Sequence, residues 1–319
     1  MGRGEVNDDV VETAAEIAEM EIRGAATIAR AAADALRTQA VESAATDVQT
    51  LDAELRAAAR RLNATRPTAV SLPNALRYVL ERAGGSDVGS YRESVVAATE
   101  DLRERLESAQ ADLGRVGANR LRDGDTIMTH CHSTAVLSVV EAARDQGLEL
   151  SAVVKETRPR EQGRITARQL RELGVPVTYI VDSAAHRYLD EVDHVCVGAD
   201  SIAADGTVVN KIGTNGLAVS ARERGVEVVV AAQTLKLDPA TLSGHNVDIE
   251  FREETEILRP EERDDIGDIE VVNPAFDATP PRYIDAIVTE EGQFPPESIV
   301  TLMRDLYGTH PSAPWEDER

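Results

Sequence analysis

Two side chains that could move protons lie at the ends of predicted strands in the second half of the chain. Cys131 follows the strand predicted for 125–130, and Asp200 ends the strand predicted for 193–200. Ligands of open parallel sheets bind beyond the carboxyl ends of the strands, so both residues stand where a substrate is expected. A thiol beside a helix N-terminus has its thiolate favoured, and a carboxyl group buried at a strand end keeps its proton more readily. A thiolate base and a protonated acid suit a proton-transfer reaction, whereas a buried free cysteine and a capping aspartate are the alternatives.

A metal site is the second interpretation of the same region. Four residues here are of types that bind zinc: His130, Cys131, His132 and Cys196. In an extended segment, however, residues 130 and 132 share one face while 131 points to the other. Cys196 stands in an apolar string, where a small buried side chain is the usual role. We therefore expect no metal ion and no other cofactor.

Three segments carry features that bind anions. In NKIGTNGLAV (210–219) the turn 213–216 precedes a predicted helix with Lys211 adjacent, so backbone N–H groups and an ammonium group could cradle a phosphate. Arg23 stands at a predicted helix break, and Arg66 precedes a helix expected to begin at the next residue. With the thiol and the acid, these segments indicate a substrate that carries more than one phosphate.

The charge of the chain excludes several classes of partner. Its 319 residues include 34 Lys and Arg against 57 Asp and Glu, a formal net charge of −23. Such a charge repels phosphate backbones and anionic lipid surfaces, so we expect no nucleic-acid partner and no membrane partner. No apolar run reaches the roughly 18 residues that span a bilayer. The acidic start lacks the layout of a signal peptide, and two cysteines give no disulfide framework, so we expect a cytoplasmic protein.

Lysine is scarce in this chain. Only Lys155, Lys211 and Lys236 of the 34 basic residues are lysines. An acidic chain with scarce lysine and 3% aromatic residues indicates adaptation to molar salt, where the Debye length is about 3 Å and acidic self-repulsion is weak. Where a surface avoids lysine, the three that remain are expected to have specific tasks, although chance retention is the alternative.

The hydrophobic pattern changes near residue 120. Residues 5 to about 115 repeat apolar residues at three- and four-residue intervals, which predicts helices, with a break at the Gly84-Gly85 pair. Beyond them, short β-rich strings alternate with helical stretches, which predicts a parallel sheet covered on both faces. The predicted fold class is α/β, with a helical N-terminal domain over 1–118 and a Rossmann-like, doubly wound parallel sheet domain over 119–319.

The β-rich strings of the second domain define its predicted strands. They lie at 125–130, 150–156, 175–182, 193–200, 226–233 and 285–292. No GxGxxG string follows the first of them, so the usual dinucleotide fingerprint is absent. The charged stretch 252–267 is expected to be a solvated loop.

Several strings form a pattern that extends from about residue 8 to the end of the chain: THCHSTA, VKETRPREQG, VDSAAHRY, GADSI, NKIGTNGLA, NPAFDATPPRYID and PWED. With them the chain resembles the family shared by archaeal ribose-1,5-bisphosphate isomerases, methylthioribose-1-phosphate isomerases and the alpha, beta and delta subunits of translation initiation factor 2B. EIRGAATIAR and RPTAVSLPNALRYV resemble the ribose-1,5-bisphosphate isomerase branch most. The resemblance implies a helical domain before a Rossmann-like domain, and a homohexamer built as a trimer of dimers.

That branch implies conversion of ribose 1,5-bisphosphate, a small sugar bisphosphate, to ribulose 1,5-bisphosphate with Cys131 and Asp200 as the catalytic pair. The resemblance also implies contacts with the substrate at Arg23, Gly24, Ala25, Ala26, Arg66, Ser133, Thr134, Ala135, Asn210, Lys211 and Lys236. Two positions depart from the pattern, because His132 stands where the family usually has Asn and Thr134 where the branch often has Lys.

Two other functions stay open on the sequence. A methylthioribose-1-phosphate isomerase would use a similar pair, but that branch carries a CNTG-type string where this chain has CHST. A non-catalytic regulatory subunit of the initiation factor 2B type would bind a nucleotide or sugar phosphate and another protein, and such subunits generally lack the cysteine and aspartate. AMP is a candidate activator that the sequence neither requires nor excludes.

Overall fold

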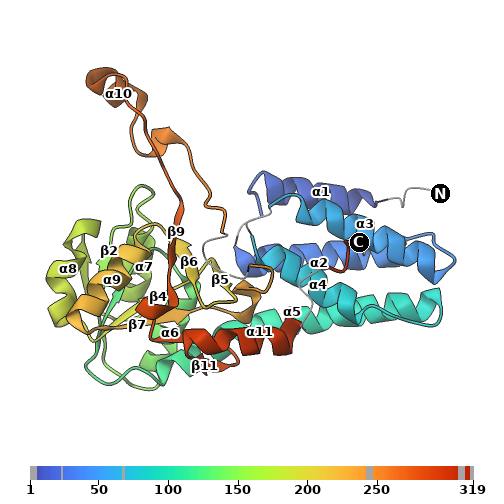
Figure 1. Cartoon of the computed structure of the whole chain (residues 1–319). Coiled ribbons are helices and arrows are strands. Elements are labelled where there is room, and N and C mark those ends of the chain that lie inside the picture. Colours follow the sequence, from blue (N-terminus) through green and yellow to red (C-terminus); the bar gives the residue numbers. More distant parts are fainter. Residues whose placement is uncertain (1–5, 23, 67–68, 242–246, 308–312, 317–319) are drawn as a thin grey trace. The chain divides into compact units, whose positions relative to one another are not determined.

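The computed structural model describes residues 6–22, 24–66, 69–241, 247–307 and 313–316 (Figure 1). The chain divides into two compact units, one over Met1–Ala109 and Thr309–Arg319 and the other over Gln110–Gly308. The division falls inside the helix α5 (Val88–Ala118), at whose end the sequence-based boundary of residue 118 lies. In the described parts of the chain, no helix combines the length and the apolar composition needed to cross a bilayer.

The first unit is helical, as predicted. Its described helices before α5 are α1 (Asp8–Ala18), α2 (Ala25–Glu42), α3 (Val48–Asn63) and α4 (Ser71–Arg82). Leu51, Leu55 and Leu62 form one fully buried stripe of α3, because residues four and seven apart share a helix face. The C-terminal segment joins this unit, since the guanidinium of Arg60 donates to the carbonyl of the buried Trp315 at 2.8 Å.

Two helix boundaries of the first unit bear on the expected binding residues. The break between α1 and α2 is confirmed, and Gly24 caps α2 with φ 87°, a left-handed conformation that favours glycine. The helix expected to begin directly after Arg66 begins instead at Ser71. The Ala69 N–H donates to the Arg66 carbonyl at 3.0 Å, so Arg66 lies in the connection before α4 and the expected start was wrong.

A seven-stranded sheet forms the centre of the second unit, in the order β11-β10-β7-β4-β1-β2-β3. All of its pairs are parallel except β10 with β11. All six predicted strands are present and the doubly wound sheet is confirmed, while the edge strand β11 was not predicted. The strands are β1 (Thr126–Thr129), β2 (Ser151–Lys155), β3 (Val177–Ile180), β4 (His194–Val197), β7 (Glu227–Ala231), β10 (Ala286–Thr289) and β11 (Gly292–Phe294).

Helices cover both faces of this sheet (Figure 1). Alternate residues of β1 point to opposite faces, so that Ile127 packs into one core and Met128 into the other. The core of Ile127 is closed by the end of α5, by α6 (Thr134–Asp145) and by α7 (Gly163–Glu172). The core of Met128 is closed by α8 (Ala185–Tyr188), α9 (Thr214–Arg224) and α11 (Ile299–Tyr307).

A second sheet of four strands, which was not predicted, lies in the same unit in the order β8-β5-β6-β9. Its strands are β5 (Ser201–Ala203), β6 (Val208–Lys211), β8 (Leu237–Asp238) and β9 (Phe276–Thr279). β5 and β8 span three and two residues, too few for an alternating pattern to be read. The antiparallel register of β6 and β9 pairs Asn210 with Asp277 and Lys211 with Phe276, and so brings two distant segments together.

The charged stretch 252–267 is not wholly a loop, which corrects the prediction. It contains the 3-10 turn η5 (Glu254–Glu256) and the helix α10 (Pro260–Ile266), which projects away from the seven-stranded sheet in Figure 1. Proline at the first position of α10 is compatible with a helix start, and the Glu262 side chain accepts from the Arg259 N–H at 2.9 Å. Pro260 and Glu262 could therefore have predicted the start of this helix from the sequence.

Substitution by alanine should change the free energy of unfolding in opposite directions at two glycines of the second unit. A Cβ at Gly163 would overlap the backbone carbonyl oxygen of Lys155, whereas a Cβ at Gly216, inside α9, would meet nothing within 4 Å. Gly163→Ala should therefore lower the free energy of unfolding by about 1–3 kcal/mol, and Gly216→Ala should raise it by about 0.5–1 kcal/mol. Denaturant unfolding of both variants in high salt measures these changes. Equal effects of the two substitutions would contradict the packing described around Gly163.

Candidate functional site

Cys131 lies just beyond the carboxyl end of β1, in the connection to α6. Its backbone has φ 70°, in the left-handed region that side-chain-bearing residues rarely adopt. Such a conformation costs about 1–3 kcal/mol and persists only where the surroundings impose it. The thiol is buried, and its Sγ donates to the Gln162 Oε1 at 3.4 Å.

The protonation of Cys131 differs from the expectation. Burial raises the pKa of its thiol, and this effect exceeds the opposing effects of the His132 backbone N–H and the Lys211 ammonium group. The sequence-based expectation of a favoured thiolate is therefore wrong for the ligand-free protein, because desolvation outweighs the donors at this site. A thiolate at this position therefore forms against the cost of burial, with the help of the Lys211 ammonium group.

Asp200 lies on the turn that joins β4 to β5. Its backbone N–H donates to the Val209 carbonyl at 2.8 Å, which fixes it beside β6. Its side chain is 46% exposed and stands 4.0 Å from the Lys236 ammonium group. The expectation of a buried acid was wrong, because β4 ends at Val197 and Asp200 is already clear of the apolar strand.

The order of the strands brings Cys131, Asp200 and Lys236 to one edge of the sheet. They follow β1, β4 and β7, which are neighbours in the sheet. The negative charge of Asp200 and the positive charge of Lys211 both act on the Cys131 thiol. Close approach between the β1 and β4 connections depends on Gly198, where an added Cβ would lie 2.5 Å from the Ser133 Oγ. The predicted catalytic pair and two predicted substrate-binding lysines therefore share one region.

Ser133, Thr134 and Ala135 form the start of α6. The Ser133 Oγ accepts from the Val136 N–H at 3.3 Å, which caps the helix. The N–H groups of the first helical turn have no partner within a helix, so those of Thr134 and Ala135 remain suited to an anion. The structure thus places these three predicted residues at a helix N-terminus directly after Cys131.

Asn210 and Lys211 end β6 and are both buried. The Asn210 Nδ2 donates to the Thr214 Oγ1 at 3.0 Å, and the Lys211 Nζ donates to the Ala275 carbonyl at 3.0 Å. The Lys211 ammonium also lies 4.5 Å from the centre of the Phe276 ring. Burial, followed by the nearby Arg252, lowers the pKa of Lys211. A negative ligand would offset both effects.

The turn 213–216 does not form the expected phosphate cradle. The Gly213 N–H donates to the Asp277 Oδ2 at 2.7 Å, and the Asn215 N–H donates to the Asp277 Oδ1 at 3.1 Å. A carboxylate of the protein therefore occupies the N-terminus of α9, although burial raises its pKa. The prediction failed because Asp277 lies more than sixty residues away in the sequence, and β9 brings it to the turn.

The side chains that suggested a metal site have other surroundings in the structure. The His130 Nε2 lies 2.8 Å from the Ile212 carbonyl, and the His132 Nε2 lies 2.8 Å from the Gln169 Oε1. Cys196 lines a separate, mainly apolar cavity of about 300 Å³ between the sheet, α5 and α6. In the described ranges of the chain, no three His, Cys, Asp or Glu side chains are grouped to hold a metal ion.

A pocket of about 240 Å³ adjoins Lys211 and Gln162, the residue that contacts the Cys131 sulfur. Its other cations are Arg158, Arg160 and Arg252. Glu256 also lines the pocket and accepts two hydrogen bonds from Arg160, at 3.0 and 2.5 Å. In a chain with a net charge of −23, this gathering of cations favours an anion.

The remaining predicted contacts belong to the first unit. Gly24 caps α2, Ala25 and Ala26 are its first residues, and Arg66 lies between α3 and α4. Arg23 is outside the described residues. Contact of these residues with the substrate stays a prediction.

Sequence reasoning missed several residues that support the site. Thr157 and Thr166 contact the Cys131 backbone, and Asp277 caps α9. The Glu290 carboxylate accepts from the Thr234 N–H at 3.0 Å and so anchors the 3-10 turn η3 (Thr234–Lys236), which carries Lys236. Thr157 and Glu290 follow β2 and β10, whereas Thr166 lies in α7 and Asp277 in β9. Their partners are distant in sequence, and only the strings TRPREQG and NPAFD gave any signal.

The sequence matches the model of the initiation factor 2 subunit family over residues 21–296. It is 66% identical over 312 residues to a ribose 1,5-bisphosphate isomerase of Haloferax volcanii, with 98% of this chain and 97% of the relative covered. It is 47% identical to a ribose 1,5-bisphosphate isomerase of Pyrococcus furiosus, with 97% and 98% covered. A haloarchaeal relative agrees with the acidic, lysine-poor composition.

Solved structures give the same relationship. The translation initiation factor eIF-2B of Pyrococcus horikoshii superposes with a TM-score of 0.76 at 29% identity, covering 92% of this chain and 99% of that one. The 5-methylthioribose 1-phosphate isomerase of Pyrococcus horikoshii superposes with a TM-score of 0.72 at 33% identity, covering 93% and 87%.

The raised pKa of Cys131 predicts how fast its thiol is alkylated. Only the thiolate reacts, so the iodoacetamide rate in the ligand-free protein should rise with pH to a midpoint above the ordinary thiol value of about 8.5. Mass spectrometry of the modified protein locates the label, and Cys131→Ser is the control for labelling elsewhere. Burial raises the pKa of Cys196 to about 12, so that thiol should stay unlabelled. A midpoint below about 8 would contradict the described burial of Cys131.

Proposed function

The chain belongs to the initiation factor 2 subunit family, and we propose that it isomerises ribose 1,5-bisphosphate to ribulose 1,5-bisphosphate with Cys131 and Asp200 as base and acid. One observation carries the mechanism: a thiol and a carboxyl group lie after neighbouring strands, with Lys211 and Lys236 beside them. Cations next to a proton-transfer pair suit a sugar that carries phosphates. Relatives at 47–66% identity bear this activity in their names.

The first proposed step opens the sugar ring. The phosphate on C1 prevents spontaneous opening, so the ring oxygen must be protonated as its bond to C1 breaks. Asp200 gives its proton to that oxygen while the Cys131 thiolate removes the proton from C2. The electron pair of the C2–H bond forms the C1–C2 double bond, and the pair of the broken C1–O bond stays on the oxygen. The product of this step is an enol.

The second step completes the isomerisation and restores both groups. The Cys131 thiol returns its proton to C1, and the enol hydroxyl on C2 gives its proton to the Asp200 carboxylate as the ketone forms. The lysines stabilise the negative charge that develops on oxygen during these transfers. In this scheme Asp200 begins the cycle protonated and Cys131 begins it as the thiolate, which the Lys211 ammonium group favours against the effect of burial.

Two features of the second unit support binding of phosphate groups. The N–H groups of Thr134 and Ala135 point from the start of α6 next to Cys131. Lys211 and Lys236 supply point charges close to Asp200. Arg66 and the residues from Arg23 to Ala26 complete the proposed contacts from the first unit. A substrate with a phosphate at each end can pair with more of these groups than a substrate that has an apolar group at one end.

Assembly, activation and location are further parts of the proposal. We propose a homohexamer arranged as a trimer of dimers, supported by exposed apolar side chains such as Phe251 and Ile266 on the segment around α10. AMP is proposed as an activator on the resemblance alone. A cytoplasmic location is supported by two free, buried cysteines. Light scattering at high salt and turnover with and without AMP test the first two.

Substitution of either catalytic residue should remove most of the activity. Because general acid–base help is worth about 10²–10⁴-fold, Cys131→Ser and Asp200→Asn should each lower kcat by that factor while substrate binding survives. Cys196→Ala, which removes the other buried cysteine, should keep kcat close to that of the unsubstituted protein. Conversion of ribose 1,5-bisphosphate by purified protein is the measurement, with 5-methylthioribose 1-phosphate as the comparison substrate.

Three results would reverse the proposal. Near-normal turnover by Cys131→Ser or Asp200→Asn would exclude that residue from the reaction. Faster turnover of 5-methylthioribose 1-phosphate than of ribose 1,5-bisphosphate would instead favour a methylthioribose-1-phosphate isomerase. Absence of any turnover, with initiation factor 2 recovered in a pull-down, would favour the regulatory subunit.

A further inference from the structure

The left-handed backbone of Cys131 is not set by either element beside it. β1 ends at Thr129 and α6 begins at Thr134, so Cys131 lies between the hydrogen-bond ladders of both. Its φ of 70° is unfavourable for a residue with a side chain. Groups outside these elements must therefore hold the peptide.

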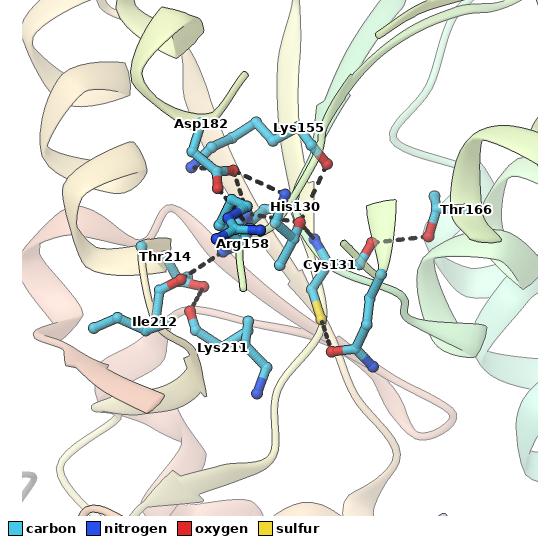
Figure 2. Close-up of polar contacts among 12 residues, drawn as sticks. His130, Cys131, Lys155, Arg158, Thr166, Asp182, Lys211, Ile212 and Thr214 are labelled. Atoms are coloured by element: carbon cyan, nitrogen blue, oxygen red, sulfur yellow. Dashed lines mark hydrogen bonds and ion pairs between the residues drawn. The ribbon is translucent and has the colours of Figure 1, made fainter. Parts of the chain in front are cut away.

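Two buried threonine hydroxyls hold the backbone of Cys131 from both sides. The Cys131 N–H donates to the Thr157 Oγ1 at 2.8 Å, and the Thr166 Oγ1 donates to the Cys131 carbonyl at 2.8 Å. Figure 2 shows Thr166 on the side of Cys131 away from His130. Each threonine is 1% exposed, so water does not substitute for either hydroxyl. Both polar groups of the Cys131 backbone thus end on side chains of one segment, 157–166.

Thr157 is itself fixed by a network of hydrogen bonds. Its own N–H donates to the Asp182 Oδ1 at 3.0 Å, and its Oγ1 lies 3.3 Å from the His130 Nδ1. The His130 Nε2 must carry a hydrogen, because its partner at 2.8 Å is the Ile212 carbonyl. Burial lowers the pKa of His130 to about 4, so the ring is neutral and its Nδ1 accepts. The Lys155 carbonyl, 3.2 Å from the Thr157 Oγ1, is a second acceptor for the hydroxyl hydrogen. With its hydrogen directed to these two acceptors, the Thr157 oxygen accepts from the Cys131 N–H.

We propose that Thr157 and Thr166 are positioning residues of the reaction, which hold Cys131 in its left-handed conformation and so direct its sulfur at the substrate carbon. The inference rests on the proposed function, in which Cys131 removes the C2 proton. Neither threonine touches the sulfur in the contacts that the structure gives, so each acts through the Cys131 peptide. A small misplacement of a reacting atom lowers a rate strongly while it leaves phosphate binding intact.

The test compares removal of each hydroxyl with its retention. Thr157→Val and Thr166→Val replace the hydroxyl by a methyl group of similar size, whereas Thr157→Ser and Thr166→Ser keep it. We expect each valine variant to lose about 10–100-fold in kcat with KM within about threefold of the unsubstituted protein. The serine variants should stay within about threefold in both parameters. Thr99→Val, which removes a fully buried hydroxyl in α5, is the matched control and should leave kcat unchanged.

A second readout makes the outcome independent of turnover. At one fixed pH, the iodoacetamide rate of Cys131 should change at least fivefold in the valine variants and stay near that of the unsubstituted protein in the serine variants. If a valine variant does not fold, the alanine variant at that position replaces it. Valine variants with kcat and alkylation rates within twofold of the unsubstituted protein would overturn the inference, and so would serine variants that lose as much as the valine ones.

These readouts separate the two proposals. If the unsubstituted protein does not convert ribose 1,5-bisphosphate, the proposed function fails, and the alkylation rates alone decide whether the threonines position Cys131. If it does convert the sugar and only the serine and valine comparison fails, the function stands and the role of the threonines is refuted.

Discussion

The parallel alignment of neighbouring strands is the constraint on which the site depends. β2, β1, β4, β7 and β10 lie next to one another and all end at the same edge. The connection that leaves each of them contributes one group: Thr157, Cys131, Asp200, Lys236 and Glu290. A residue that follows one strand is thereby brought beside residues that are distant in sequence. Contacts with β6 and with α7 then fix the backbones of Asp200 and Cys131.

Salt weakens the interactions of buried charges less than it weakens those of surface charges. At molar salt the Debye length of about 3 Å screens exposed pairs, but buried groups are screened much less. Lys155 and Lys211 are both buried, and burial lowers the pKa of each. Lys155 lies 4.0 Å from Asp182, and Lys211 acts on the Cys131 thiol. Two of the three lysines of this acidic chain thus lie in buried surroundings, where salt screens a charge least. Specific tasks for the lysines stay a prediction.

Much of the fold could be predicted from the sequence, because the signals were local. The helical first unit, the six strands of the large sheet and the placement of Cys131 at a strand end all follow from periodicity within short windows. The second sheet could not be predicted, since β5 and β8 are too short to show a pattern. The exposure of Asp200 depends on where β4 ends, and strand boundaries are less well defined by sequence than strand positions.

The hydrogen bonds that support the site could not be predicted from the sequence, for a different reason. Asp277 fills the turn before α9, and Thr157 and Thr166 hold Cys131, through partners that only the folded chain brings together. The raised pKa of Cys131 likewise depends on burial, whereas its position before a helix suggested a favoured thiolate. The residue types at the strand ends thus indicated proton transfer. The hydrogen bonds and the burial that change the properties of these residues could be known only from the tertiary structure.

A crystal structure of the Cys131→Ser variant with ribose 1,5-bisphosphate would examine the central claim most directly. The account predicts the sugar between residue 131 and Asp200, with C2 within about 3.5 Å of the serine Oγ and the ring oxygen in hydrogen-bond reach of the carboxyl group. A bisphosphate bound elsewhere, or a sugar whose C2 faces away from residue 131, would contradict it.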